Sequence, residues 1–199
     1  MYKLVLDTAT DYYYLALIKD NIVLDEKYEY SLGNHSETMM PALEAILLKN
    51  KLKLKDVKEI YTGVGPGSYT GERIAVVVSK MLGIMNNIPV YSFSTLALIA
   101  SSSNSECYPF IDARRGNAYI AHFKNDETHL ERIEEDRVAS LDEYFLNREE
   151  DKKMMIFFGK PNAIKLINSK ECHLVNDINA LTPNYLQLVE AERKRRGLE

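Results

Sequence analysis

Short apolar runs separated by polar breaks fill the first hundred residues of the chain. Runs over residues 2–7, 12–19 and 22–30 predict three strands, with an Asp20-Asn21 turn pair between the last two. Asn34 and Glu37 have the spacing of a capping-box variant and predict the start of a helix. Periodicity then predicts a strand over 59–64, a helix from Thr70 to about Asn87, a strand over 89–93 and a helix over 94–101. This order, β-β-β-α-β-α-β-α, indicates a fold of the α/β class.

A polar Ser-Ser-Ser-Asn-Ser run at residues 101–105 interrupts the pattern and predicts a domain boundary. We therefore expect one lobe over residues 1–103 and a smaller one over 104–182. Beyond the break, the pattern predicts strands over 107–112, 118–124, 154–158 and 172–176, a charged surface segment over 126–151, and helices over 161–168 and from Pro183 to about Arg196. Each half opens with a strand that ends in an aspartate, Asp7 or Asp112, as a duplicated α/β fold would.

Charge and hydropathy exclude several classes of protein. The net charge is −4, and neither half is typical of a nucleic-acid binder, because neutralising phosphates requires a basic face. The basic cluster Arg193-Lys194-Arg195-Arg196 is either a solvated helix end or a contact to RNA or to a partner. No apolar run approaches the ~18 residues that span a bilayer, and the N-terminus lacks a signal-peptide pattern. Together with the two cysteines, these features predict a cytoplasmic chain without membrane contact.

The glycine-rich segment Gly65-Pro66-Gly67-Ser68-Tyr69-Thr70-Gly71 is the most informative motif. A strand, a glycine-rich loop and a helix start together form an anion site, because free N–H groups and the helix dipole favour negative charge. The segment is not a Walker A loop, since no lysine follows Gly71, and it is not a nucleophile elbow, since Pro66 replaces the required glycine. A tight turn and a contact to phosphate or nucleotide remain alternatives. The candidate anion-binding residues are Asp7, Thr8, Thr10, Gly65, Gly67, Ser68, Thr70 and Asp112.

The sequence contains no complete catalytic or metal set. Asp7 and Asp112 each close a strand, so they either help to hold a metal and a phosphate or simply cap turns. His35 has Met39, and not a second histidine, four residues later, and one histidine alone does not hold a metal. We therefore expect His35 to be a capping or surface group, and we predict no metal site and no catalytic residue.

Five segments form a more specific pattern along the chain: Leu6-Asp7-Thr8-Ala9-Thr10, His35-Ser36-Glu37 with Pro41 after it, Gly65 to Ile74, Ile111 to Arg115, and Pro183-Asn184-Tyr185-Leu186. In order and spacing they resemble the TsaB (YeaZ) family, the bacterial subunit of the system that makes threonylcarbamoyladenosine in tRNA next to the anticodon. The resemblance implies an actin/Hsp70/hexokinase-like (ASKHA) fold, with two α/β lobes, mixed sheets and a reduced second lobe. It also implies that a last helix over 183–199 returns to the first lobe.

The resemblance further implies a role and partners. Members of this family work with a paralogue, TsaD, that carries the catalytic metal on an H-x-x-x-H helix, and with an ATPase, TsaE. Because Met39 stands where the second histidine would be, the resemblance implies a non-catalytic scaffold subunit that docks its first two helices on TsaD. The expected interface, unless these residues form the core of the lobe, consists of His35, Glu37, Met39, Met40, Leu43, Leu47, Ile74, Val78, Met81 and Met85.

The remaining expectations concern ligands and rival functions. The chain itself is expected to need no cofactor, with ATP or ADP at the subunit interface left open, and to contact tRNA only indirectly. Without TsaD the same surface could support a homodimer. Glu72, Ala75 and Ala9 depart from the family pattern and argue against nucleotide binding by this chain alone. The alternative functions are a nucleotide-dependent ATPase or kinase of the same fold and a glycoprotease-like metallopeptidase.

Overall fold

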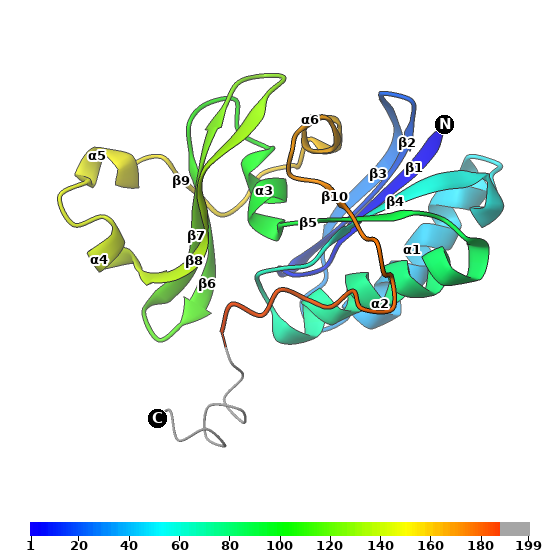
Figure 1. The fold of residues 1–199 in the computed structure, drawn as a ribbon, viewed down its shortest axis with the longest axis horizontal. Helices are drawn as coiled ribbons and strands as arrows, with labels where there is room; N and C mark the ends of the chain where they lie inside the picture. Colours follow the sequence, from blue (N-terminus) through cyan, green and yellow to red (C-terminus); the bar gives the residue numbers. More distant parts are fainter. Residues whose placement is uncertain (188–199) are drawn as a thin grey trace, which may run out of the picture.

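The computed structural model describes residues 1–187 as two α/β lobes that lie side by side (Figure 1). The first lobe holds a six-stranded mixed sheet in the order β10-β5-β4-β1-β2-β3, and the second holds a four-stranded mixed sheet in the order β8-β7-β6-β9. The elements of the first sheet and its helices are β1 (Tyr2–Asp7), β2 (Tyr12–Lys19), β3 (Ile22–Tyr30), α1 (His35–Lys49), η1 (Leu54–Asp56), β4 (Val57–Gly63), α2 (Tyr69–Asn86), β5 (Val90–Phe93) and α3 (Thr95–Ala100). Those that follow are β6 (Tyr108–Arg114), β7 (Asn117–Asn125), β8 (Leu130–Ser140), α4 (Leu141–Tyr144), α5 (Glu149–Lys152), β9 (Met155–Ile156), α6 (Ala163–Asn168) and β10 (His173–Leu174).

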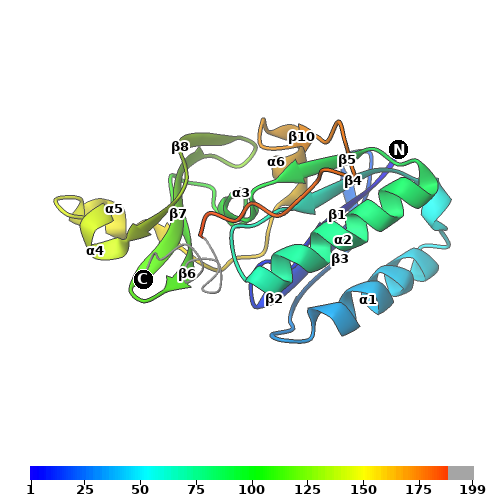
Figure 2. The ribbon, with the colours of Figure 1, turned by 60° about the horizontal axis from the view of Figure 1, so that its bottom comes forward.

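The first sheet is covered on both faces, because its central strands alternate apolar side chains from one face to the other. Leu4 and Leu6 of β1 pack with α1 and α2, which lie next to each other under the sheet in Figure 2. Val5 packs on the opposite face with α3 and α6. This second core also includes Cys107 and Phe123 of the second lobe, so a continuous apolar cluster joins the two lobes.

The two long helices start differently. Ser68 is the N-cap of α2, with extended backbone angles, and its hydroxyl oxygen accepts a hydrogen bond from the N–H of Gly71. Asn34 lies at the N-cap of α1, but its backbone has φ −118° and ψ 12°, and its side chain makes no capping hydrogen bond. The capping-box prediction for Asn34 and Glu37 is therefore wrong, although the helix begins where it was expected.

The charged segment after residue 126 contains a strand that the sequence pattern did not predict. β8 runs for 11 residues and pairs with β7 in antiparallel orientation. Its half-buried positions include Arg132, Glu134 and Asp136. Because charged residues occupy the positions that apolar residues would take in an ordinary strand, the hydrophobic alternation that signals a strand is missing.

The chain returns to the first sheet near its end. β10 pairs with β5, and the backbone N–H of Asn184 donates to the carbonyl oxygen of Val64. Residues 183–187 are not helical, so the expected helix does not begin at Pro183; its remainder, with the cluster Arg193–Arg196, lies outside the described residues. The division into lobes at residues 103 and 104 and the extent of the returning segment stay predictions.

Within the described residues, no helix is long and apolar enough to cross a membrane.

Candidate functional site

The glycine-rich loop joins β4 to α2 and packs directly on the turn after β1. A Cβ atom added at Gly67 would lie 2.2 Å from the carbonyl oxygen of Ala9, and one added at Gly71 would lie 2.1 Å from that of Thr8. The backbone N–H of Ser68 donates to the same Ala9 oxygen at 2.7 Å. Close packing of backbone against backbone by itself accounts for these two glycines.

Asp7 ends β1 inside the protein, with only 2% of its surface exposed. The Thr95 hydroxyl donates to one carboxylate oxygen at 2.7 Å, and the backbone N–H of Ala9 donates to the other at 2.9 Å. Burial raises the pKa of Asp7, while these two hydrogen bonds oppose the shift. Gly63 leaves room for the carboxyl group, since a Cβ atom there would lie 1.7 Å from it.

The hydroxyl groups of Thr8, Thr10 and Ser68 have structural partners. The Thr8 hydroxyl donates to the carbonyl oxygen of Gly71 at 2.6 Å and accepts from the N–H of Ala75 at 3.0 Å, which ties β1 to α2. Among the described residues, the Thr10 side chain bonds only to the backbone of Tyr12, within its own turn. Thr70, one residue after the start of α2, is exposed.

Glu72 is a member of the loop region that the site prediction did not include. Its side chain is buried, and its carboxyl group fills the space beside Gly65, where a Cβ atom would lie 2.4 Å from Oε1. Burial raises the pKa of Glu72 to about 8, and the negative charge of Asp7 adds to the shift, while the N–H of Gly67 and the charge of Arg73 oppose it. A carboxyl group of the chain itself therefore takes up the space that the missing side chain of Gly65 leaves at the loop.

Asp112 lies apart from this arrangement, at the end of β6. It is exposed, and its carboxylate accepts a hydrogen bond from the N–H of Arg114 at 2.7 Å, inside the β6–β7 turn. In residues 1–187, no three His, Cys, Asp or Glu side chains are arranged to hold a metal ion. The structure thus brings Asp7, Thr8, Gly65, Gly67 and Ser68 together, and anion binding by them stays a prediction.

His35 is buried and not on the surface. Its Nε2 atom lies 2.8 Å from the carbonyl oxygen of Thr10, and its Nδ1 atom is buried without a hydrogen-bond partner in the described part of the chain. The expectation of a surface or capping group is wrong, because the first turn of α1 packs against the β1–β2 turn.

The expected interface residues of α1 and α2 divide into two sets. Those that are buried in the core of the first lobe are His35, Met39, Leu43, Leu47 and Val78, with Ile74 partly buried against it. Those that are exposed are Glu37, Met40, Met81 and Met85. Most of the expected interface residues of α1 therefore belong to the core, because the helix packs on both the sheet and α2.

Similarity to known proteins identifies the family. The model of the family described as "TsaD: tRNA N6-adenosine threonylcarbamoyltransferase" matches residues 29–173, well over half of the chain. A protein of Bacillus subtilis named "tRNA threonylcarbamoyladenosine biosynthesis protein TsaB" is 27% identical over 222 aligned residues, which cover 96% of each chain. The chain belongs to the TsaD family, on its TsaB (YeaZ) branch. The Escherichia coli protein with the same name is 31% identical over 129 residues, 62% of this chain and 55% of that protein.

Solved structures of the TsaB (YeaZ) family have the same fold. YeaZ from Pseudomonas aeruginosa superposes with a TM-score of 0.77 and 22% sequence identity, covering 93% of this chain and 99% of that one. A second Pseudomonas aeruginosa structure, described as similar to the peptidase YeaZ, has a TM-score of 0.79 and also 22% identity. The two lobes with mixed sheets are thus the ASKHA fold that the sequence predicted.

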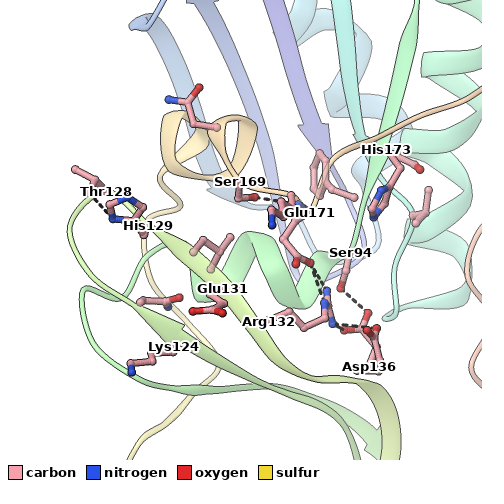
Figure 3. A pocket seen from close by; sticks show the side chains of 18 of the residues that line it. Ser94, Lys124, Thr128, His129, Glu131, Arg132, Asp136, Ser169, Glu171 and His173 are labelled. Atoms are coloured by element: carbon pink, nitrogen blue, oxygen red, sulfur yellow. Dashed lines mark hydrogen bonds and ion pairs between the residues drawn. The ribbon is translucent and has the colours of Figure 1, made fainter.

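A cavity of this TsaB family member lies between the lobes and extends to Val64, the residue before the glycine-rich loop. Its volume is about 1020 Å³, and Figure 3 shows side chains from several elements around it. Ser94 comes from the β5–α3 junction, Arg132 and Asp136 from β8, and Glu171 and His173 from the segment after α6. Sequence reasoning missed Arg132 and Asp136 because it assigned 126–151 to the surface, and no local pattern in the charged sequence of β8 signals their burial.

Proposed function

We propose that this chain is a non-catalytic subunit that binds the TsaD paralogue and supports it in forming threonylcarbamoyladenosine in tRNA. Membership of the TsaD family and the names of the TsaB relatives support the pathway. The lone His35, which has Met39 four residues later, supports the absence of a metal-dependent active site in this chain. The TsaE ATPase is the further partner in this proposal, tRNA contact is indirect, and the location is cytoplasmic.

The observation that carries the proposal is the exposed apolar surface of the helix pair. The apolar side chains on it have exposed fractions between 39% and 75%, and they are Met40 and Leu48 on α1 and Val77, Met81, Ile84 and Met85 on α2. On α2 their spacing of four, three and one residues keeps them on one side of the helix. Large apolar side chains exposed on one side of a helix indicate an interaction site, and methionine adapts to a partner's surface. We call these six residues the helix-pair surface.

The test is disruption of this surface at positions that do not support the core. The double variant Met81→Asp and Met85→Asp should abolish co-purification with the TsaD paralogue, because it puts two charges into a desolvated contact. Leu146→Asp is the matched control, since Leu146 is 70% exposed but lies in the second lobe after α4. An unchanged complex with the folded double variant would contradict the proposal. Met39→Asp would test only the core, since Met39 is 1% exposed.

A nucleotide-dependent enzyme of the same fold has weaker support. The buried carboxyl group of Glu72 fills the space beside Gly65, so a phosphate group at this point of the glycine-rich loop would have to displace it. ATP or ADP at the interface with a partner stays a prediction, as does a homodimer in the absence of TsaD. Light scattering on the purified native chain and on the purified double variant measures the molar mass of each. A dimer mass for the native chain and a monomer mass for the variant would show a homodimer through the helix-pair surface.

A further inference from the structure

A cluster of charged side chains lies at the interlobe cavity (Figure 3). The guanidinium group of Arg132 donates from Nε and Nη2 to Glu171, at 2.9 and 2.5 Å, and from Nη1 to Asp136. Both carboxylates thus bind one cation from different directions. A guanidinium group suits this arrangement because its donors are held in a rigid planar fork.

The cluster connects three separate parts of the chain. Arg132 and Asp136 belong to β8 in the second sheet, whereas Glu171 lies between α6 and β10, just before the chain joins the first sheet. The hydroxyl of Ser94, at the junction of β5 and α3, donates to the second oxygen of Asp136 at 2.5 Å. The next residue, Thr95, donates to Asp7. The first sheet is therefore attached to the second through consecutive polar contacts.

The charges of the cluster are shielded from water. The side chains of Arg132, Asp136 and Glu171 are 14%, 9% and 9% exposed, and the guanidinium carbon lies 4.7 Å from the centre of the Phe123 ring. Burial weakens screening by salt, and removal of one partner leaves an uncompensated buried charge. Most other ion pairs in residues 1–187 have at least one strongly exposed partner, such as Lys153 with Glu150.

We propose that the Arg132–Asp136–Glu171 cluster, together with Ser94, is an interlobe lock that fixes the angle between the two lobes. An apolar cluster also joins the lobes, but apolar attraction by itself has no direction. Hydrogen bonds from one guanidinium group to two carboxylates do have direction, and they tolerate little rotation. The chain then behaves as a rigid body and not as a clamp that opens. This inference rests on the contacts alone and is independent of the proposed function.

The test is the distribution of distances between the lobes. Spin labels at Glu44→Cys on α1 and Glu143→Cys on α4, two exposed positions, report the interlobe distance by pulsed electron resonance in a Cys172→Ser background. We expect one narrow distribution for the otherwise native chain and a broadened or shifted one for Arg132→Met. Lys153→Met, which removes an ion pair inside the second lobe, is the matched control and should leave the distribution narrow.

A milder variant keeps the test decisive if Arg132→Met does not fold. Ser94→Ala leaves the charges of the cluster paired and removes the hydrogen bond from the first lobe to Asp136, together with the capping bond that Ser94 accepts from the N–H of Leu96 in α3. A broadened distribution in Ser94→Ala, with an unchanged circular dichroism spectrum, supports the lock. An unchanged narrow distribution in the folded Arg132→Met variant, or in Ser94→Ala where Arg132→Met does not fold, overturns it.

Discussion

At the scale of single residues, the carboxyl group of Glu72 is the most unusual feature of the first lobe. It is buried at the start of α2, near Asp7 and Arg73, and its charge also acts on Tyr119 of the second lobe. Its pKa is raised to about 8 because burial disfavours the ionised form and the nearby Asp7 repels it. At neutral pH the group is therefore mostly protonated, which lowers the cost of placing two carboxyl groups at one loop.

The raised pKa predicts a pH-dependent stability. The folded chain binds more protons than the unfolded chain between pH 4.5 and about pH 8, so stability decreases as the pH rises through this window. The slope from Glu72 is at most about 1.4 kcal/mol per pH unit. Glu72→Gln should reduce the dependence of the free energy of unfolding on pH, and Asp7 leaves a remaining dependence of the same sign. Glu44→Gln, at an exposed position, should leave the pH dependence unchanged. Urea unfolding from pH 5 to pH 9 measures both, and equal slopes in Glu72→Gln and the native chain would refute the assignment.

At the scale of elements, α1 and α2 each have a typical capping residue before their first turn, but the two helices begin differently. Ser68 and Asn34 are both typical N-cap residues, yet only Ser68 makes a side-chain capping bond. α1 begins without one, because its first turn is held by the contact of His35 with Thr10 and by packing on the sheet. Tertiary contacts can thus replace a cap.

This difference predicts unequal costs for two similar substitutions. Ser68→Ala should lower the free energy of unfolding by about 1 kcal/mol, because the N–H of Gly71 loses its partner. Asn34→Ala should cost clearly less, since no capping bond is lost. Chemical denaturation of both variants gives the comparison, and an equal or larger loss in Asn34→Ala would show that the cap assignment is wrong.

At the scale of the whole molecule, the segment over residues 173–187 holds the end of the described chain against the first lobe. β10 extends the sheet beyond β5, and the Lys80 amino group on α2 donates to the carbonyl oxygens of Asn179 and Leu181. The segment therefore lies along α2, in the path seen in Figure 2, without covering the helix-pair surface. Lys80 thus contributes two of the hydrogen bonds that attach this segment to α2.

Removing this lysine should loosen the segment while sparing the fold. Lys80→Met should increase amide hydrogen exchange at Asn184 several-fold, with little change in α2, because the attachment to Asn179 and Leu181 is lost. Lys58→Met is the control, since within residues 1–187 the Lys58 amino group bonds only to a carbonyl three residues before it. Exchange at Asn184 that matches the native chain would show that backbone pairing alone holds the segment.

Most of the first lobe could be predicted from the sequence because its signals are local. The strands over 2–7, 12–19 and 22–30 agree with the structure to the residue, since apolar alternation and turn residues determine them directly. The second lobe was less predictable. The half-buried side of β8 carries charges whose partners are distant in sequence, such as Glu171 for Arg132, so no local pattern shows that they are buried.

The sequence by itself determined the α/β class, the glycine-rich loop and the family, because periodicity and motifs are properties of neighbouring residues. Only the tertiary structure decided which side chains of α1 and α2 remain exposed, that the carboxyl group of Glu72 packs beside Gly65, and that Arg132 joins the two lobes. The reason is physical: burial and ion pairing depend on the distance between elements, and that distance exists only once the sheets and helices have packed.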